Sequence, residues 1–320
     1  MNTTSAIVHA RNLRRTFGTV EAVSDLSFHL PRGRVTGFIG ANGAGKTTTM
    51  RMMATLDLPN RGSIEIDGVD VMENPAHARR NIGWMPDAYG NYQDMTVWEY
   101  LDFFARAFGY TGAERTRRVN EVMDFADLHV LAERPANTLS KGMSQRLCLG
   151  RSLIHDPPVL ILDEPAAGLD PKARVEFKHL VRLLAAEGKT VFISSHILSE
   201  LAEMCDTLLF IDNGRLIHEG TAESLMHGDT AGCAYAVEVA GPLDQLEEWV
   251  AMRPEASLME LRKRGALVRI DHTDPAEISG VLKQMLADGL QVTEFHREQR
   301  KLEDAFIEIL EKLNPGPEAS

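Results

Sequence analysis

A glycine-rich loop between a short apolar run and a helix-forming segment constrains this chain more than any other feature. Residues 40–48 read Gly-Ala-Asn-Gly-Ala-Gly-Lys-Thr-Thr and follow the apolar run Val35–Ile39. A strand, a glycine loop and a helix, in this order, form a phosphate-binding P-loop. A plain glycine turn would not need every fixed position of that motif, and here all of them match. The sequence therefore predicts a nucleotide-binding site at residues 40–48.

The residue types of this loop explain its chemistry. Glycines let backbone N–H groups close around a phosphate, and the N-terminus of the following helix adds partial positive charge. Lys46 is predicted to reach the outer phosphates and to take part in catalysis, and the Thr47 hydroxyl is predicted to bind Mg²⁺. The predicted nucleotide-binding residues of the loop are Asn42, Gly43, Ala44, Gly45, Lys46, Thr47 and Thr48.

Composition restricts the classes of protein that such a loop could serve. The 320 residues, 44% of them hydrophobic and 25% charged, are typical of a globular chain with about two domains. The net charge of −12 argues against a nucleic-acid partner. Three widely separated cysteines indicate neither a disulfide framework nor a zinc site, and they fit a reducing cytoplasm. No apolar run approaches the ~20 residues that span a bilayer, so a membrane process would need a second chain.

Alternating strands and helices are predicted from about Ile7 to Gly220. Several of the strands are short and apolar, which favours a largely parallel sheet covered on both faces. The predicted strands are Val35–Ile39, Ser63–Ile66, Ile82–Met85, Val159–Leu162, Thr190–Ser194 and Thr207–Ile211. Three helices without an intervening strand interrupt this order, namely Thr96–Phe108, Ala113–Phe125 and Ser140–Ile154. We therefore predict an α/β P-loop NTPase core at residues 1–226, with a helical subdomain inserted at about 88–156.

A second, smaller domain is predicted after a change of composition near His227–Gly232. Its elements follow the order βαββαβ, which is typical of a small ferredoxin-like α+β domain. They are Tyr235–Val239, Leu243–Met252, Leu258–Leu261, Ala266–Ile270, Ala276–Ala287 and Gln291–Phe295. A final amphipathic helix, Leu302–Leu313, completes a domain predicted at residues 233–313. The tail 314–320 is predicted to be disordered.

Two carboxylates, Asp163 and Glu164, follow the apolar strand Val159–Leu162. The carboxyl edge of a buried parallel strand is where α/β proteins bind their ligands. Asp163 is predicted to hold Mg²⁺, directly or through water, and Glu164 to orient or deprotonate an attacking water. Acidic residues commonly end strands, so this prediction depends on the glycine loop elsewhere in the chain.

The segment Leu139-Ser140-Lys141-Gly142-Met143, which precedes a helix, resembles the signature motif of ABC ATPases, LSGGQ. Lys141 and Met143 replace a glycine and the glutamine of that motif, whereas Ser140 and Gly142 are retained. In the family these two retained positions contact the γ-phosphate of ATP bound to the P-loop of the opposite subunit. The resemblance therefore implies ATP and Mg²⁺ as ligands and a homodimer that encloses two nucleotides. Taken alone, Ser140 could be an ordinary helix N-cap.

Further motifs occur in the order of this family. Residues 166–170 resemble the D-loop, which crosses the dimer interface, and His196 resembles the switch histidine that contacts the γ-phosphate. Phe17 resembles the aromatic residue that stacks on adenine, with packing in the core as the alternative. Asp87 stands where the family normally has a glutamine that contacts Mg²⁺. Aspartate could still bind the metal, and its extra negative charge implies an altered Mg²⁺ optimum.

The finer resemblance is to ATP-binding subunits of multidrug-type exporters, whose membrane domain is a separate polypeptide. It rests on the variant signature and on Leu302-Glu303-Asp304-Ala305-Phe306, which is similar to a C-terminal element of that subgroup. It implies ATP hydrolysis coupled to transport, an integral membrane permease as partner, and a peripheral location on the cytoplasmic face of the cell membrane. The transported substrate and the role of the second domain stay open.

Two other classes of protein share part of this pattern. Soluble ABC ATPases of ribosomes usually carry two cassettes, and those of DNA repair separate the P-loop from the acidic strand by a long coiled coil, whereas this chain has one compact cassette. A P-loop kinase or GTPase would not need the signature segment, and the chain has no Asn-Lys-x-Asp motif for guanine.

The predicted helix Thr96–Phe108 is apolar over most of its surface, apart from one polar stripe. The residues of that stripe are Glu99, Asp102 and Arg106. Such a helix fits burial in the helical subdomain, a groove for a helix of a partner, or both.

Overall fold

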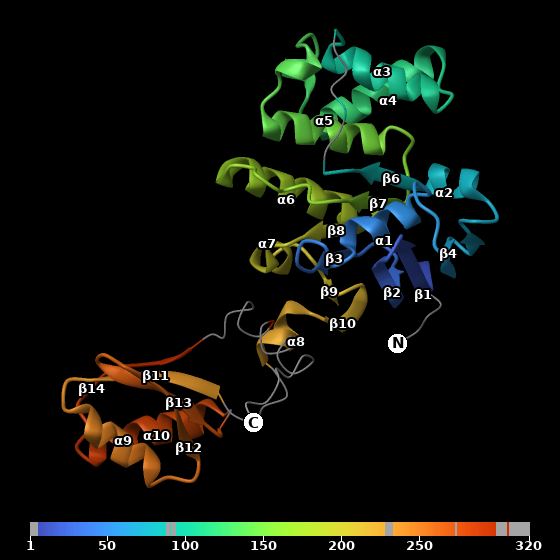
Figure 1. The fold of residues 1–320 in the computed structure, drawn as a ribbon. Coiled ribbons are helices and arrows are strands. Elements are labelled where there is room, and N and C mark those ends of the chain that lie inside the picture. The colour runs from blue at the N-terminus through green and yellow to red at the C-terminus, as the bar shows by residue number, and fades with distance from the viewer. Residues whose placement is uncertain are drawn as a thin grey trace. The chain divides into compact units, whose positions relative to one another are not determined.

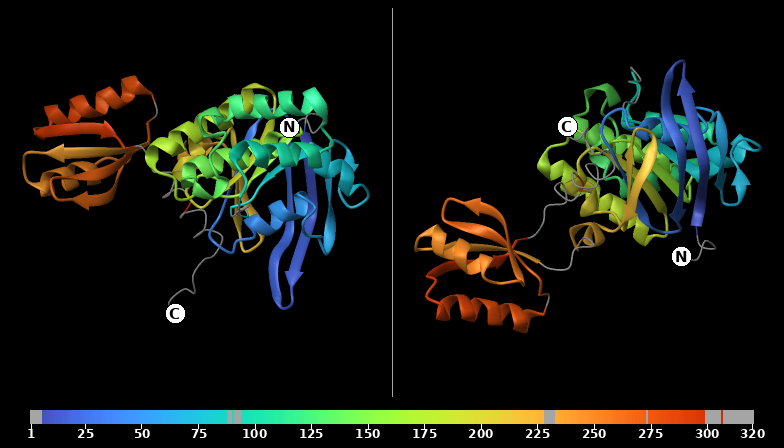
Figure 2. Two further views of the ribbon diagram at one scale, coloured as in Figure 1. Left: turned by 90° about the horizontal axis from the view of Figure 1, so that it is seen from above. Right: turned by 60° about the horizontal axis from the view of Figure 1, so that its bottom comes forward.

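The computed structural model describes residues 6–87, 90, 94–227, 233–272, 274–298 and 306. The chain divides into two compact units, Met1–Ala222 and Glu223–Ser320, which Figures 1 and 2 show as ribbons. Most of the predicted linker, the tail, and the predicted final helix except for Phe306 lie outside the described residues. In the part of the chain that the structure describes, no helix is long and apolar enough to cross a membrane.

A six-stranded sheet forms the centre of the first unit. Its strand order is β10-β9-β3-β8-β7-β6, and every pair except β9 and β10 is parallel. Its strands are β3 (Val35–Ile39), β6 (Ile82–Met85), β7 (Val159–Leu162), β8 (Thr190–Ser195), β9 (Thr207–Asp212) and β10 (Arg215–Gly220). β7 is buried along its whole length, which explains why it reads as an unbroken apolar run. The predicted parallel sheet is confirmed.

A second sheet of the first unit is antiparallel, with the order β2-β1-β4-β5. Its strands are β1 (Ala6–Phe17), β2 (Val20–Pro31), β4 (Arg61–Ile66) and β5 (Val69–Asp70). The prediction that placed Ser63–Ile66 among the strands of the parallel sheet is wrong, because β4 pairs antiparallel with β1. The hairpin of β1 and β2 was not among the predicted strands. A strand is identified in a sequence by the alternation of buried and exposed residues. Register shifts between β1 and β2 interrupt this alternation, so these two strands were missed.

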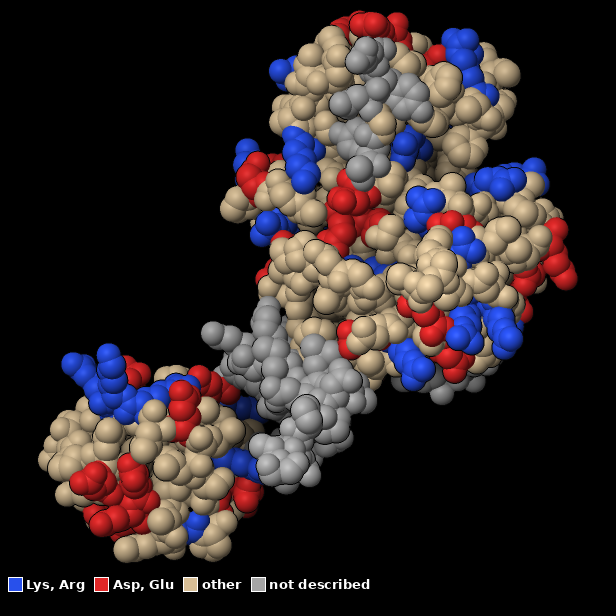
Figure 3. Space-filling model, viewed as in Figure 1, with Lys and Arg blue, Asp and Glu red and all other residues tan. Residues whose placement is uncertain are grey.

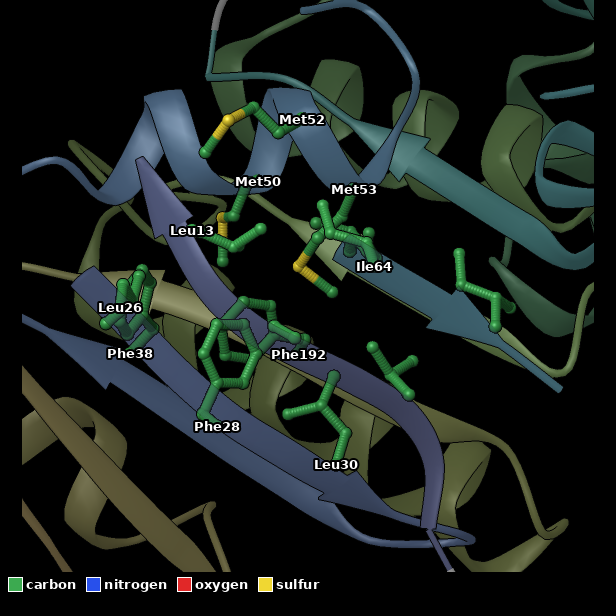
Figure 4. Packing of buried hydrophobic residues seen from close by; sticks show 14 of the residues in the cluster. Leu13, Leu26, Phe28, Leu30, Phe38, Met50, Met52, Met53, Ile64 and Phe192 are labelled. Atoms are coloured by element: carbon green, nitrogen blue, oxygen red, sulfur yellow. The ribbon is translucent and has the colours of Figure 1, made fainter. Parts of the chain in front are cut away.

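The main core lies between the two sheets, as Figure 4 shows. The rings of Phe28 on β2 and Phe38 on β3 lie with centroids 6.0 Å apart, and Phe192 on β8 packs against both. Gly37, the neighbour of Phe38, faces the other side of the sheet, where a Cβ would come within 3.2 Å of Leu201 in α7 (Leu198–Ala202). Both faces of the parallel sheet are therefore covered, as predicted. The helices that pack on the strands of the first unit include α1 (Lys46–Met53), α2 (Pro75–Asn81), α6 (Pro171–Ala186) and α7 (Leu198–Ala202).

Three helices stand together beside the β6 edge of the parallel sheet (Figure 1). They are α3 (Val97–Ala107), α4 (Gly112–Phe125) and α5 (Lys141–Leu153), and the short turns η2 (His129–Leu131) and η3 (Ala136–Thr138) lie between α4 and α5. The sequence placed Asp102 on a polar stripe, but Asp102 is buried and forms ion pairs with Arg106 (2.7 Å) and Arg115 (2.6 Å). Phe103 and Phe108 are exposed. Part of α3 is therefore buried in the helical subdomain, and part of its apolar surface faces outward. The groove for a helix of a partner stays a prediction.

His155 joins these helices to the sheet. It follows α5, and its Nε2 lies 2.9 Å from the carbonyl oxygen of Ile82 at the start of β6. The ring of Phe108 stacks on the imidazole with the centroids 4.0 Å apart. Burial lowers the pKa of His155 to about 4, because a charged ring would lose solvation here, and the hydrogen bond to Ile82 only partly opposes this effect.

This lowered pKa predicts that the fold loses stability in acid. His155 binds a proton near pH 6.5 in the unfolded chain, but only near pH 4 in the folded chain. Between these values the unfolded state binds more protons, so through this residue the free energy of unfolding should fall by about 3 kcal/mol as the pH drops. Urea denaturation at several pH values measures this. His155→Gln keeps an N–H group for Ile82 but cannot titrate, so its stability should fall less; identical pH curves would refute the prediction.

The second unit contains an antiparallel sheet with the order β12-β13-β11-β14 and two packed helices. Its elements are β11 (Cys233–Val239), α9 (Leu243–Ala251), β12 (Ala256–Arg262), β13 (Gly265–Ile270), α10 (Pro275–Ala287) and β14 (Val292–Arg297), after the short helix α8 (Ala222–His227). Leu246 and Trp249 of α9 and Met285 of α10 pack with Val268 of β13 in one core. The element order is the βαββαβ that the sequence predicts, and the first and third strands pair at the centre of the sheet.

Candidate functional site

The glycine loop joins β3 to α1 and encloses the ammonium group of Lys46. Lys46 is only 6% exposed, and its Nζ donates to the carbonyl oxygens of Gly40 (2.7 Å) and Ala41 (3.2 Å). A Cβ at Gly40 or at Gly45 would lie 2.4 Å from a backbone carbonyl oxygen of another segment. Gly45 also has a φ of 107°, in the region that favours glycine. The path of this backbone therefore requires glycine at both positions.

The predicted phosphate-binding residues lie in this loop or in the first turn of α1. Helix α1 begins at Lys46, so Thr47 and Thr48 follow directly in its first turn. The N–H groups of a first turn have no partner within their own helix and point toward the loop. Together with the helix dipole they form a ready site for an anion.

Asp163 and Glu164 lie at the carboxyl end of β7 and are held by the neighbouring strand β8. Leu162 of β7 pairs with Ile193 of β8, so the residues that follow meet across the two strands. The Ser194 hydroxyl donates to Oδ1 of Asp163 (2.7 Å) and accepts from the N–H group of Glu164 (2.8 Å). No role was predicted for Ser194 from the sequence. Its role could have been predicted only from the pairing of β7 with β8, and the sequence does not show which strands pair.

The surroundings of Asp163 suit a divalent cation. Burial raises the pKa of Asp163, hydrogen bonds from Ser194 and Thr47 lower it, and the negative charges of Glu164 and Asp87 raise it further. A cation at this point would relieve the repulsion among the three carboxylates. The predicted metal ligands Thr47, Asp87 and Asp163 therefore lie close together. Figure 3 shows acidic side chains gathered in the middle of one face of the first unit.

This arrangement is not a closed metal cage. Among the described residues, no group of three or more histidine, cysteine, aspartate or glutamate side chains could hold a metal ion alone. Mg²⁺ in phosphate-binding sites keeps several water ligands and needs only one or two carboxylates besides the phosphates. The residues present therefore fit Mg²⁺ carried by a nucleotide.

Glu164 connects the glycine loop to His196. One carboxylate oxygen, Oε1, lies 3.5 Å from Nζ of Lys46, and the other, Oε2, lies 2.8 Å from Nδ1 of His196. Oε1 is buried and has no hydrogen bond among the described residues. The backbone of Glu164 has a φ of 47°, which is uncommon for a residue with a side chain. A carboxylate placed in this way can orient a water molecule or accept a proton from it.

The signature-like segment begins α5. The Ser140 hydroxyl caps this helix by accepting from the N–H group of Met143 at 3.4 Å, and a Cβ at Gly142 would come within 3.1 Å of Ala173 in α6. No hydrogen bond or ion pair of the described residues joins Ser140 or Gly142 to the loop 40–48.

Phe17 ends β1 with an exposed ring. It is 46% exposed, so the alternative that it packs in the core is wrong. The guanidinium carbon of Arg15 lies 4.4 Å from the centre of the ring, as in a cation–π contact. An exposed aromatic ring can stack on a nucleobase, but it has no polar atom with which to distinguish one base from another.

A phosphate-sized loop that faces the acidic end of a parallel strand defines a P-loop nucleoside triphosphatase. The family described as ABC transporter matches residues 23–167 of this chain. The Nod factor export ATP-binding protein I of Ralstonia nicotianae is 35% identical over 308 residues, which cover 95% of this chain and 93% of that protein. A protein of the same name from Burkholderia lata is 39% identical over 237 residues, which cover 74% of this chain and 77% of that protein. The chain belongs to the ABC transporter family and is one of its ATPase subunits.

Solved structures agree with this assignment. A structure described as the ATP-binding subunit of an ABC transporter is 30% identical and superimposes with a TM-score of 0.63. The match covers 69% of this chain and 92% of that chain. A dimeric ATP-binding cassette bound to ADP and Pi is 25% identical and has a TM-score of 0.61. The match covers 67% of this chain and 98% of that chain. The predicted ATPase class is confirmed, and the alternative of an unrelated P-loop kinase or GTPase is excluded.

Proposed function

We propose that this chain is the ATP-binding subunit of an export system in which two copies drive a separate integral membrane permease. The names of relatives that match over 95% of the chain contain the words export and ATP-binding protein, which supports both parts. In this proposal residues 1–226 form the nucleotide-binding domain and residues 233–313 an accessory domain. The protein would lie on the cytoplasmic face of the membrane through its permease.

The observation that carries the proposed catalytic site is the continuous contact from Lys46 through Glu164 to His196. Lys46 exchanges the carbonyl oxygens of its loop for phosphate oxygens, which bind an ammonium group more strongly. Glu164 then holds the attacking water and accepts its proton, and His196 fixes the carboxylate and faces the γ-phosphate. Phe17 stacks on adenine.

Mg²⁺, when bound with ATP, would neutralise part of the phosphate charge, and Thr47, Asp163 and Asp87 would hold it. Ser140 and Gly142 of the second copy complete each site, so that two nucleotides lie between two subunits. The dimeric cassette among the solved structures supports this arrangement. Closure with ATP and opening after hydrolysis then convert nucleotide state into movement of the permease.

Affinity purification of the tagged chain from its native host in mild detergent tests the proposal. We expect a polytopic membrane protein to co-purify in stoichiometric amount, and an untagged strain should yield none. Ribosomal proteins or DNA-repair factors without a membrane protein would overturn the transport function. The identity of the membrane protein would narrow the substrate.

Replacement of Asp87 should change the Mg²⁺ dependence of hydrolysis. Asp87 adds a negative charge beside Asp163, and removing one such charge weakens cation binding by about 1 kcal/mol, or roughly fivefold. Asp87→Gln should therefore need several-fold more Mg²⁺ for half-maximal ATPase activity. Asp87→Asn, which removes the charge without lengthening the side chain, separates charge from length. If both variants titrated with Mg²⁺ like the wild type, Asp87 would have no influence on the metal.

A further inference from the structure

A partly buried ion pair contacts the segment that carries His196. Glu200 in α7 is only 8% exposed, and its Oε1 lies 3.0 Å from Nε of Arg174, in the first turn of α6. The pair touches neither the glycine loop nor the acidic end of β7 through any hydrogen bond or ion pair of the described residues. A buried carboxylate is stable only with a charged partner, so this pair fixes α6 and α7 to each other at one point.

Arg174 holds the loop at residues 166–170. Its Nη2 donates to the carbonyl oxygen of Leu169 at 3.3 Å, while its Nε faces Glu200. The planar guanidinium fork can serve two acceptors at once with a fixed angle between them. The position of this loop is thereby coupled to the position of Glu200.

Glu200 holds the backbone that carries His196. Its Oε2 lies 3.5 Å from Oγ of Ser195, and the same Oγ accepts from the N–H group of Ile197 at 3.0 Å. Ser195 and Ile197 precede and follow His196, so the segment is held on both sides of the histidine. The contacts therefore run from Leu169 through Arg174 and Glu200 to Ser195. The next residue, His196, lies 2.8 Å from Glu164 through its Nδ1.

We propose that the pair of Arg174 and Glu200 positions His196 against Glu164 and keeps the loop 166–170 in register with it. Both are positioning residues, since they act through His196 and not on the nucleotide. This inference rests on the roles proposed for Glu164 and His196. Loss of the pair should slow hydrolysis and leave ATP binding intact, because the loop 40–48 keeps its own contacts.

Glu200→Gln tests the inference, with Glu203→Gln as a matched control. Glu203 lies one helical turn later, is exposed, and pairs with Lys178, also one turn after Arg174 on α6. A displacement of His196 by about 1 Å should reduce kcat roughly 10- to 100-fold. We expect this loss in Glu200→Gln, with KM for ATP and binding of a fluorescent ATP analogue within about twofold of wild type. Glu203→Gln should behave like the wild type in every assay.

The outcomes separate a positioning role from a structural one. If kcat of Glu200→Gln equals that of Glu203→Gln, the inference is wrong. It is also wrong if kcat and ATP binding fall together with the melting temperature, because that pattern indicates partial unfolding. Should Glu200→Gln fail to fold, Arg174→Lys replaces it: lysine keeps the charge opposite Glu200 but cannot hold Leu169 at the same time. A selective loss of kcat is again expected, and wild-type kcat would overturn the inference.

The same assays distinguish failure of the inference from failure of the proposed site. A wild-type kcat in Glu164→Gln or His196→Ala would refute the roles on which the inference rests. A large loss in those two variants, together with normal kcat in Glu200→Gln, would leave the site in place and remove only the positioning pair.

Discussion

Replacement of Glu164 by Gln is expected to lower kcat for ATP hydrolysis by about 10³-fold while ATP still binds. Gln has the size of Glu and can still form a hydrogen bond with His196, but it cannot accept a proton from water. It also removes a negative charge 3.5 Å from Lys46, so the ammonium group stays fully available to the phosphates. Because opening of the proposed dimer follows hydrolysis, the variant should accumulate as a closed dimer with ATP.

Three measurements check this expectation. Phosphate release gives kcat, a fluorescent ATP analogue gives affinity, and gel filtration with ATP and Mg²⁺ gives the oligomeric state. Glu187→Gln, at an exposed position after α6, is the control for the substitution itself and should match the wild type. Retained hydrolysis would exclude Glu164 as the base. A variant that binds ATP and stays monomeric would contradict the nucleotide sandwich.

The glycine loop and the acidic strand end were predictable because their residue types are dictated locally. Glycine at position 45 follows from a backbone φ that few other residues adopt, and the unbroken apolar run of β7 follows from burial on both faces. Both properties leave a local signal in the sequence, a glycine and an unbroken apolar run, which can be recognised without knowing the rest of the fold. These two signals led to the P-loop core and to Asp163 and Glu164.

Residues whose roles depend on the neighbour of a strand or helix were not predictable. Ser194 holds the acid pair only because β8 lies beside β7, and Arg174 meets Glu200 only because α6 and α7 pack together. The environment of Asp102 depends on a neighbouring helix in the same way: helical periodicity places it on a polar stripe of α3, and Arg115 from α4 forms an ion pair with it. The periodicity of one helix shows where its polar side lies and not which other element buries it.

Substitution of Gly45 by Ala should both destabilise the fold and abolish nucleotide binding. The new Cβ would lie 2.4 Å from the carbonyl oxygen of Ala22, a backbone atom that cannot rotate away. The φ of 107° adds strain for any residue with a side chain. Together these effects should lower the free energy of unfolding by about 3 kcal/mol or more. The loop must move to relieve the collision, and with it the N–H groups that would bind phosphate.

Gly43→Ala is the matched control, because the chain offers a second glycine of similar conformation in the same loop. Gly43 has a φ of 84°, but a Cβ there would meet no atom within 4 Å. Its substitution should cost only the backbone strain, about 1 kcal/mol. Urea denaturation without nucleotide compares the two variants directly. A larger loss of unfolding free energy in Gly45→Ala than in Gly43→Ala would show that the close approach of Ala22 fixes the loop. Equal losses would mean that the φ angle alone determines the destabilisation and that the loop can move at Gly45.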